Sequence, residues 1–482
     1  MRDPVVALLL GLVTALSRIP FVAQRLWEWD SVLYARALEH GFHVDDVLVG
    51  SRPHPPGYVF YLAAAALAKA VGLDSDHALV LVSVLASGAA VAACYLLCRR
   101  FAGSTVSLLL AVAFAADPLL WLHGEVAMPY VLLAPVATAV ALAFRAGRGA
   151  ADRRAVAASF LFGAIAGFRQ DVLVLLLPLW LWMLVPATAR TRSRSFAALA
   201  GGCLLWFVPS ALLSDGPVEY VTRTARQLAG IGTASANAER SVAVNLAILG
   251  SALWWGLLFL TLAVAVLGLA RLLALRHATA RRASADAQFF ALWLVPGVLF
   301  YVFVHIGEWG PALFLVPGLY GLLAWLIRPL VPRLVPAARA AGAALIVANA
   351  LLGAWLFAFG DDAVFSAASL RAHDRATDAK TAYIRALPAD STVVLASAEL
   401  LVAAYYLPDR TIWYSNRAAT GRYERRLPRP TTVVVYEASA RPDVDARSSL
   451  VEAAPGVRLE LLAVDAGPLV LPGSDIDASL RR

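Results

Sequence analysis

The sequence is poor in charged residues and in cysteine. Only 15% of its 482 residues are Asp, Glu, Lys or Arg, and 60% are hydrophobic. A soluble globular domain has about half apolar and about a quarter charged residues, so most of this chain is expected to be solvated by lipid. The three cysteines, Cys94, Cys98 and Cys203, lie in apolar runs without zinc or redox spacing. We interpret them as small packing residues.

Basic residues occur in short bursts between the apolar runs. The formal net charge of +8 could indicate nucleic-acid binding. Here, however, the arginines recur at alternate turns along the chain, which is the positive-inside pattern of a polytopic membrane protein, so nucleic acid is excluded as a partner. The bursts are Arg99-Arg100, Arg145/Arg148/Arg153/Arg154, Arg190/Arg192/Arg194, Arg271/Arg276/Arg281/Arg282 and Arg328/Arg333/Arg339.

Apolar runs that could cross a bilayer follow one another up to about residue 359. A spanning helix needs about 17–25 apolar residues. The stretch 155–187 has arginines at both ends, so it must cross twice with a turn at Arg169. This gives about eleven crossings, with the N-terminus inside and the C-terminus outside. The first run, 4–22, lacks a small-residue cleavage site and is interpreted as a retained span. The other runs are 78–98, 105–122, 128–144, 196–213, 243–270, 287–304, 311–327 and 338–359.

The segment 58–72 is the main uncertainty in this topology. It carries Lys69 and is too short to cross comfortably. We interpret it as an interfacial helix on the outer surface, because a crossing there would put Arg99-Arg100 outside. The first outer loop then runs from about 23 to 77, which is long for a connector and points to a functional loop.

The composition changes at about residue 360, where charged residues reach ordinary density and short β-type runs alternate with turn signals. The predicted organisation is an α-helical polytopic membrane domain over 1–359, including the first outer loop, and a small C-terminal α/β extracytoplasmic domain over 360–482. The predicted elements of the second domain are a helix at 371–387, strands at 391–395 and 431–436, and a closing hairpin of 457–461 with 469–471.

The first outer loop carries most of the candidate chemistry. Asp30 follows Trp27 and Trp29 just past the membrane exit. A partly desolvated carboxylate there could act as a general base for an incoming hydroxyl; alternatively, Asp30 caps the helical run 31–40. In His54-Pro55-Pro56-Gly57-Tyr58, two prolines stiffen the chain and would hold His54 in a defined position near the membrane. The alternative is a turn with a solvent-exposed histidine.

These residues resemble the first outer loop of the GT-C glycosyltransferases. The pattern is Asp30-Ser31-x-x-Tyr34-Ala35-x-Ala37, followed by a basic residue, Pro-Pro-x-Tyr. Relatives in this superfamily include protein O-mannosyltransferases and lipid A aminoarabinose transferases. The many-span layout, the long first loop and the outer C-terminal domain are similar too.

The resemblance implies an enzyme that inverts the anomeric centre of a polyprenyl-phosphate sugar. Asp30 would be the base that deprotonates the acceptor hydroxyl, His54 would contact the donor phosphate, and Tyr34 and Tyr58 would belong to the same binding region. Many relatives have a second acidic residue directly after the catalytic aspartate, where this chain has Ser31. We therefore expect no required metal and no other cofactor.

Further candidates lie in the later outer turns. Glu125 matches a second acidic position of the resembling superfamily, while Asp117, before a proline, would cap a helix or line the cavity. Arg169 could pair with a phosphate or with Asp171 alone. The turn with His305 and Glu308 corresponds to one that borders the lipid-donor groove in the superfamily; the alternative there is simple loop solvation.

The function predicted from these features is that of an inverting glycosyltransferase of the GT-C type. It would move a hexose or pentose from a polyprenyl-phosphate donor to a protein, glycan or lipid acceptor hydroxyl at the outer face of the cytoplasmic membrane. The alternative is a polytopic transporter or flippase of a lipid-linked sugar or envelope precursor. Against that alternative, charged residues are not gathered at the middle of the spans and no internal repeat is seen. A third possibility is a scaffold in envelope assembly.

Overall fold

The structure is a computed structural model that describes residues 3–45, 52–150, 152–236, 242–277, 284–444 and 446–475. The chain forms two compact units, and each unit draws on two separate parts of the sequence. The first unit contains residues 1–22 and 56–369, and the second contains 23–55 and 370–482. The sequence-based division grouped residues 23–55 with the membrane domain and placed the boundary after residue 359 rather than after residue 369.

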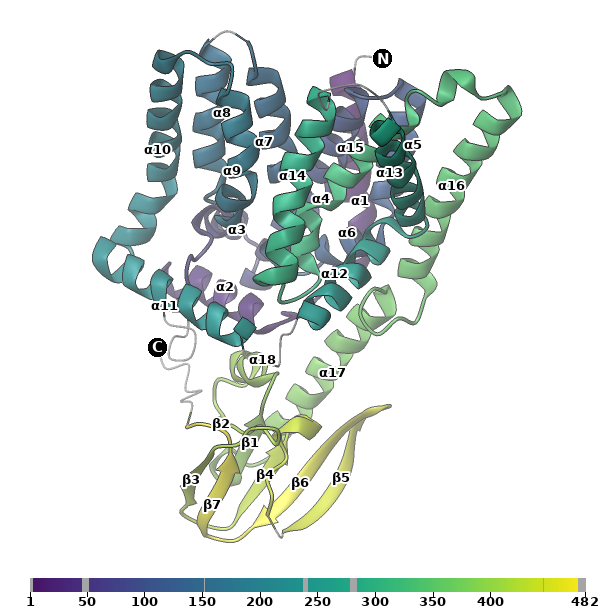
Figure 1. The fold of residues 1–482 in the computed structure, drawn as a ribbon. Helices are drawn as coiled ribbons and strands as arrows, with labels where there is room; N and C mark the ends of the chain where they lie inside the picture. Colours follow the sequence, from purple (N-terminus) through teal and green to yellow (C-terminus); the bar gives the residue numbers. More distant parts are fainter. Residues whose placement is uncertain are drawn as a thin grey trace. The chain divides into compact units, whose positions relative to one another are not determined.

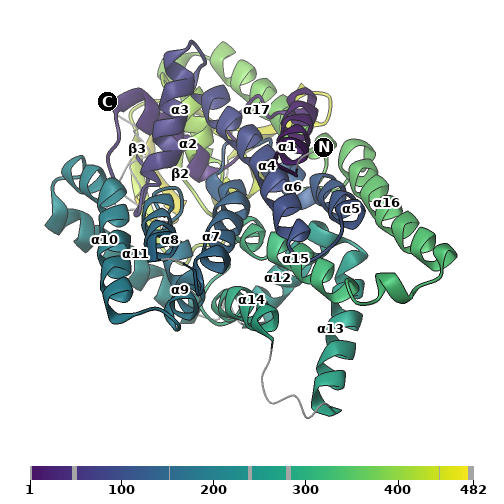
Figure 2. The same cartoon turned by 90° about the horizontal axis from the view of Figure 1, so that it is seen from above.

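The first unit is built from helices. Its elements are α1 (Asp3–Arg18), η1 (Ile19–Phe21), α3 (Val59–Ala70), α4 (Ser75–Arg99), α5 (Ser104–Ala115), α6 (Pro118–His123), η2 (Pro129–Leu132), α7 (Leu133–Gly147), α8 (Asp152–Ile165), α9 (Asp171–Leu184), α10 (Ala189–Leu212), α11 (Pro217–Ala236), α12 (Val242–Leu257), α13 (Leu260–His277), α14 (Ala285–Phe303), η4 (Gly310–Phe314), α15 (Val316–Ile327), η5 (Val331–Arg333) and α16 (Pro336–Phe359). The long helices run side by side (Figure 1). Seen from above, α8, α9 and α10 group at one side and α5, α13 and α16 at the other (Figure 2).

Several of these helices can cross a membrane. Six described helices are long and apolar enough, and the bent pair α12–α13 would make a seventh. Three further apolar helices are shorter: α3 and α5 have 12 residues each and α9 has 14. The protein is therefore a multi-pass membrane protein, while the count of about eleven crossings stays a prediction for the shorter helices. The six are α1 with η1, α4, η2 with α7, α10, α14 and α16.

The helices pack through small residues, as is common between helices in lipid. A Cβ on Gly88 of α4 would lie only 2.4 Å from the carbonyl oxygen of Gly11 in α1. In the same way, a Cβ on Gly202 of α10 would lie 2.4 Å from the carbonyl oxygen of Phe160 in α8. Because these backbones touch, a side chain at either position would separate the two helices.

The predicted span 243–270 is not one straight helix. It is divided into α12 and α13, which meet at an angle of 105°. At the break, Leu258 has a positive φ of 51°, which a leucine rarely adopts. The Leu257 carbonyl oxygen accepts a hydrogen bond of 3.2 Å from Nδ2 of the buried Asn349. This bond satisfies a carbonyl group at the end of α12. Nothing in the apolar sequence around Leu257 indicates that the helix ends there.

The second unit contains a five-stranded mixed sheet. Its elements are α2 (Trp29–His40), α17 (Ala367–Ala386, from Leu370 onward), η6 (Ala389–Ser391), β1 (Thr392–Ala396), α18 (Leu400–Tyr406), β2 (Thr411–Tyr414), β3 (Arg422–Leu427), β4 (Thr431–Val435), η7 (Ala438–Ala440), β5 (Arg447–Ala454), β6 (Val457–Val464) and β7 (Gly467–Pro472). The strand order is β2-β1-β4-β6-β5, with β1 parallel to both β2 and β4. The central strands are apolar and buried on both faces, as expected for parallel strands.

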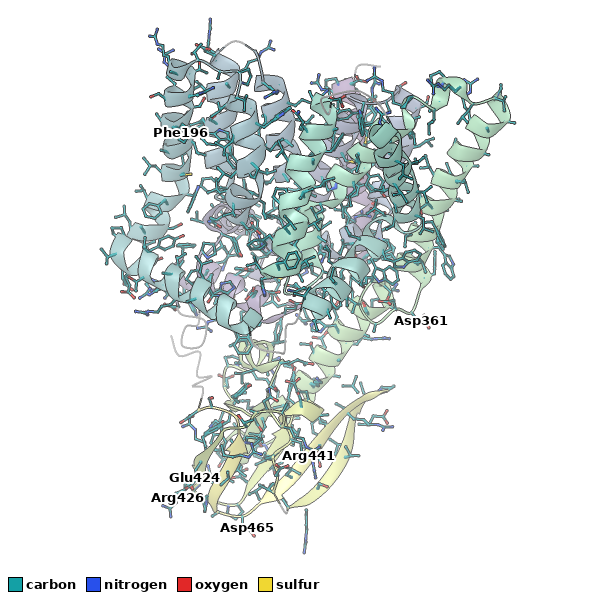
Figure 3. All side chains as sticks on the ribbon, viewed as in Figure 1. Phe196, Asp361, Glu424, Arg426, Arg441 and Asp465 are labelled. Carbon is teal, nitrogen blue, oxygen red and sulfur yellow. The ribbon has the colours of Figure 1, made fainter. Side chains whose placement is uncertain are left out.

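Two layers cover this sheet. Val394 and Ala396 belong to a core cluster on one face, together with Ile384 of α17 and Leu400 of α18. On the other face, Leu395 packs in a second cluster, which includes residues of β3 and β7. In β3, Glu424 and Arg426 alternate with half-buried residues and project outward (Figure 3). The two-residue period of a strand thus separates the core from the surface.

The predicted closing hairpin is wrong, although both of its strands exist. β6 pairs with β4 and β5, whereas β7 pairs antiparallel with β3 in a separate two-stranded sheet. The actual hairpin is β5–β6, which turns at Gly456 with a φ of 79°. The reason for the different pairing of β7 is burial, because Leu469 and Leu471 cover the second face of the larger sheet.

Candidate active site

The second unit holds Asp30, Tyr34 and His54. Asp30 is the second residue of α2, and the N-cap is Glu28. The Glu28 N–H donates to Ser31 Oγ at 3.2 Å in a capping box. The interpretation of Asp30 as the helix cap is therefore wrong, because a reciprocal Glu28–Ser31 pair already performs that role. Tyr34, one turn further along α2, is buried.

Asp30 and His54 lie together although 24 residues separate them in the chain. The distance from His54 Nε2 to Asp30 Oδ2 is 3.3 Å, and that from His54 Nδ1 to the Pro55 carbonyl oxygen is 2.7 Å. Both partners are acceptors, so an imidazolium with two N–H groups would satisfy both contacts. The two side chains retain 25% and 17% exposure. His54 is thus held in place and is not a freely exposed turn residue, and the Asp30 carboxylate remains open to solvent.

A second pair in this unit has the same chemistry. His43 Nε2 lies 3.1 Å from Asp45 Oδ1, and these side chains are 19% and 26% exposed. Geometry and burial alone do not distinguish the two pairs. Only the surrounding sequence pattern favours Asp30, which makes Asp45 a matched control.

In the first unit, Arg169 is enclosed by aromatic rings. Its guanidinium carbon lies 4.8 Å from the centre of the Tyr58 ring and 4.6 Å from that of Tyr130. Nη2 donates to Asp171 Oδ2 at 2.9 Å, so the predicted local salt bridge is present. Burial by itself would lower the pKa of Arg169, but Asp171 and the two tyrosines raise it above its usual range. We call Arg169, Tyr58, Tyr130 and Asp171 the Arg169 cage.

The Arg169 cage leaves part of the guanidinium available. Nε also faces Asp171, at 3.4 Å, whereas Nη1 has no hydrogen-bond partner among the described residues. A planar cation with a remaining donor, held between two rings in a buried position, is suited to a phosphate oxygen.

Local backbone features hold Tyr58 in position. Tyr58 precedes α3 with a φ of 49°, a left-handed conformation that costs a non-glycine residue about 1 kcal/mol or more. The adjacent chain is fixed by a hydrogen bond of 3.0 Å from Tyr220 Oη to the Pro56 carbonyl oxygen. The Phe60 N–H donates to the Gly167 carbonyl oxygen at 3.2 Å, which joins α3 to the turn that carries Arg169.

The turn that carries His305 and Glu308 borders the Arg169 cage. It follows α14, contains Gly307 with a φ of 73°, and leads into η4 at Gly310. A Cβ on Gly310 would lie 2.6 Å from the Tyr130 ring. His305 and Glu308 are both partly exposed. The structure thus brings this turn to the Arg169 cage, while its place beside a lipid-donor groove and the ligand contacts of the two side chains remain predictions.

Glu125 lies deeper than expected for a residue of an outer loop. It is fully buried, and neither carboxylate oxygen has a hydrogen-bond partner among the described protein groups. Burial raises the pKa of Glu125 well above its usual range, although the charge of Arg18 opposes this shift. The nearby His123 is also buried, which lowers its pKa to about 4, and both of its ring nitrogens lack partners within the described residues. Buried groups without partners are uncommon and indicate a polar interior site.

Sequence analysis missed Arg18, which ends α1 and is fully buried. Its Nη2 donates to the Ala115 carbonyl oxygen at 2.6 Å, and its guanidinium lies 4.2 Å from the Trp121 ring centre. It interacts electrostatically with Glu125 and Asp117. The sequence did contain a signal for Arg18: a charged residue within an apolar run is costly and needs partners. We call Arg18, Asp117 and Glu125 the Arg18 cluster.

Asp117 belongs to the interior of the first unit. It accepts a hydrogen bond of 3.0 Å from Tyr320 Oη and is buried beside the Arg18 cation. Asp117 is also the N-cap residue of α6, although its side chain makes no capping hydrogen bond, and its predicted role in lining a cavity remains a prediction. Over the described ranges, no group of three or more His, Cys, Asp or Glu side chains is arranged to hold a metal ion.

No protein-family model and no curated protein matches the sequence. The fold, however, is similar to that of solved structures. ArnT from Cupriavidus metallidurans bound to undecaprenyl phosphate aligns over 95% of this chain and 98% of its own, with a TM-score of 0.56 and 14% identity. Its apo state aligns over 99% and 98%, with a TM-score of 0.54 and 15% identity.

A second solved protein has a similar fold. The oligosaccharyltransferase of Archaeoglobus fulgidus in complex with Zn and sulfate aligns over 85% of this chain and 62% of its own, with a TM-score of 0.51 and 14% identity. The resemblance to GT-C glycosyltransferases that the first outer loop indicated is therefore confirmed at the level of the fold.

Proposed function

We propose that the protein is an inverting glycosyltransferase. It moves a sugar from a polyprenyl-phosphate donor to an acceptor hydroxyl at the outer face of the cytoplasmic membrane. The acceptor hydroxyl oxygen attacks the anomeric carbon, and the bond from that carbon to the phosphate oxygen breaks. The electron pair leaves with the phosphate, which gives polyprenyl phosphate. Asp30 accepts the hydroxyl proton, so the reaction needs no redox partner.

The Arg169 cage is the observation that supports this proposal most. A buried cation with one free donor suits a leaving phosphate that gains negative charge in the transition state. The fold adds support, because ArnT, which has a similar fold, was crystallised with undecaprenyl phosphate. His54, His305, Glu308, Tyr34 and Glu125 are proposed to contact donor or acceptor, and Asp30 to act as the base.

The test is turnover of a panel of polyprenyl-phosphate sugars by the purified protein, with crude envelope material as acceptor. We expect wild type to release polyprenyl phosphate and Asp30→Asn to lose about a thousandfold in kcat, as is typical for loss of a general base. Asp45→Asn is the matched control, because Asp45 also pairs with a histidine, at 3.1 Å against 3.3 Å for Asp30, and its exposure is 26% against 25%. It should keep wild-type turnover.

Two other outcomes would change the assignment. If Asp45→Asn loses activity and Asp30→Asn does not, the base is misassigned. If wild type releases nothing across the panel but binds the donor, a transporter of the lipid-linked sugar becomes the better description.

A chelator such as EDTA should leave turnover unchanged, because Ser31 replaces the second acidic residue of the motif.

The proposed orientation has the N-terminus in the cytoplasm and the second unit outside. It can be tested with Ser449→Cys, an exposed position on β5, in a Cys203→Ser background. The remaining cysteines, Cys94 and Cys98, are buried. An impermeant maleimide should label this variant without disruption of the inner membrane. Labelling only after that membrane is breached would put the second unit in the cytoplasm.

A further inference from the structure

The segment that leads to Asp30 has no strand or helix of its own over 22–28, yet several of its backbone groups are satisfied. The N–H groups of Gln24 and Arg25 both donate to the carboxylate of Asp374 in α17, each at 3.0 Å. One side chain thus binds two successive amides, as a capping residue does at a helix end.

The next residue is held in the same way. The Leu26 N–H donates to Tyr406 Oη at 2.9 Å, and the Leu26 carbonyl oxygen lies 3.0 Å from Nε2 of His373. Leu26 itself is fully buried. Three consecutive amides and one carbonyl are therefore paired with side chains from residues 373–406, more than 340 residues later in the chain. Because Leu26 is fully buried, its backbone groups need such partners.

Side chains of the same region continue the contact. The Trp27 ring lies 4.8 Å from the His373 ring, and Trp29 packs against the core cluster beneath the sheet. At the far end of α2, Tyr405 Oη donates to Glu39 Oε1 at 2.5 Å. Since Asp30 lies between these anchors, both ends of its helix are fixed to the C-terminal part of the second unit.

We infer that the C-terminal part of the second unit holds the Asp30 segment in its reactive position, with Asp374 as the main positioning residue. This inference rests on the proposed function, because it assigns to residues 370–475 a part in that reaction. It does not require these residues to bind the acceptor. The role is positional, since Asp374 bonds to the backbone of Gln24 and Arg25 and reaches Asp30 only through them.

The experiment compares Asp374→Ala and Asp374→Asn with Asp378→Ala in the intact protein. Asp378 lies one turn later on α17 and pairs with the Arg25 side chain at 2.6 Å, but this ion pair is exposed. Exposed pairs contribute little, so Asp378→Ala is the matched control. Two readouts are taken: hydrogen–deuterium exchange of peptides that cover 23–40, and the separate kcat and KM for the donor.

We expect Asp374→Ala to speed exchange in 23–40 alone and to lower kcat by about ten- to a hundredfold, with KM for the donor nearly unchanged. Asp374→Asn keeps one acceptor oxygen, so its exchange rate in 23–40 and its kcat should lie between those of wild type and Asp374→Ala. Asp378→Ala should match wild type in both readouts.

Three results would overturn the inference: unchanged exchange in Asp374→Ala, faster exchange with normal kcat, or an equal effect of Asp378→Ala. Faster exchange throughout the second unit would also overturn it, because Asp374 would then be a general stability residue. Failure of the proposed function would give a different result from failure of this inference. In that case wild type itself releases no polyprenyl phosphate, whatever the exchange data show.

Discussion

Arg18 and Arg169 are both buried in the first unit, but their surroundings differ. Arg18 faces two carboxylates, those of Asp117 and Glu125, and donates to a backbone carbonyl. Arg169 faces one carboxylate, that of Asp171, which is partly exposed, and two tyrosine rings. Arg18 thus lies among acidic side chains and a backbone carbonyl, whereas Arg169 lies mainly between aromatic rings. Each guanidinium keeps one nitrogen without a partner among the described residues, Nε in Arg18 and Nη1 in Arg169.

We interpret this difference as the reason why Arg169, rather than Arg18, is the proposed phosphate ligand. An anion that approached Arg18 would have to compete with the two acidic side chains of the Arg18 cluster. The rings around Arg169 attract the cation through their quadrupoles but do not use up its hydrogen-bond donors. Burial alone therefore does not identify a phosphate site; the balance of charge around the buried cation does.

The largest expected effect concerns Arg18, the arginine that we interpret as structural. At a pH above the raised pKa of Glu125, where its carboxylate is charged, Arg18→Met leaves that charge buried without a counter-ion, which typically costs about 3–5 kcal/mol of stability. We expect a large drop in thermal unfolding temperature in detergent and a low yield of folded protein. Addition of Glu125→Gln to Arg18→Met should recover part of the loss. A normal unfolding temperature combined with weak donor binding would reverse the roles assigned to the two arginines.

The second prediction concerns Arg169, the proposed phosphate ligand. Arg169→Met should weaken binding of polyprenyl phosphate by about ten- to a hundredfold, the equivalent of one charged hydrogen bond of about 1.5–3 kcal/mol. Arg169→Lys should recover little, because an ammonium cannot replace a planar guanidinium stacked between two rings. Direct binding of the lipid is the measurement. Unfolding temperature should fall less than in Arg18→Met, and a larger fall would count against the comparison.

The third prediction uses pH to examine the Arg18 cluster. Burial raises the pKa of Glu125, so the folded protein keeps a proton that the unfolded chain has lost above about pH 4.3, the usual glutamate value. Stability should therefore fall as pH rises through the window between the usual and the raised pKa, by at most about 1.4 kcal/mol per pH unit. Glu125→Gln should flatten this slope in unfolding scans from pH 5 to 8. Parallel slopes would exclude Glu125 as the source.

The smallest predicted effect comes from the ring that supports Arg169. Gly310→Ala would put a Cβ 2.6 Å from Tyr130, so the ring must shift away from the guanidinium. A weakened cation–π contact of about 0.5–1 kcal/mol should reduce lipid affinity about two- to fivefold. Gly250→Ala is the control, since a Cβ there meets nothing within 4 Å. Equal affinities in the two variants would show that the position of Tyr130 does not matter.

Much of the fold was accessible from sequence because lipid imposes a simple rule on composition. The apolar runs became helices, and the polar triplet at Arg169 became the turn between α8 and α9. The break at Leu258 was not predictable, since it depends on Asn349, about ninety residues away. The same holds for β7, whose partner β3 precedes it by about forty residues.

The candidate site was accessible only in part. Local motifs indicated Asp30, His54 and Arg169, because their chemistry stands out from an apolar background. Glu28 as the cap of α2, and Tyr130 as a wall of the Arg169 cage, depend on side-chain geometry that spacing does not reveal. Arg18 was passed over because a single charge hardly changes the mean hydropathy of a span, although its burial needed partners from α5 and the loop after α6.

The long-range pairing of residues 24–26 with Asp374 and Tyr406 bears on how the protein is made. The two partners are separated by about 350 residues, and ribosomes add about 5–20 residues per second. Residues 24–26 are therefore synthesised roughly 20–70 seconds before Asp374 and Tyr406, their hydrogen-bond partners. A nascent chain cannot form these hydrogen bonds, so residues 24–26 take their described positions only when synthesis is nearly complete. If the proposed function is correct, termination anywhere before α17 would give a membrane-inserted but inactive product.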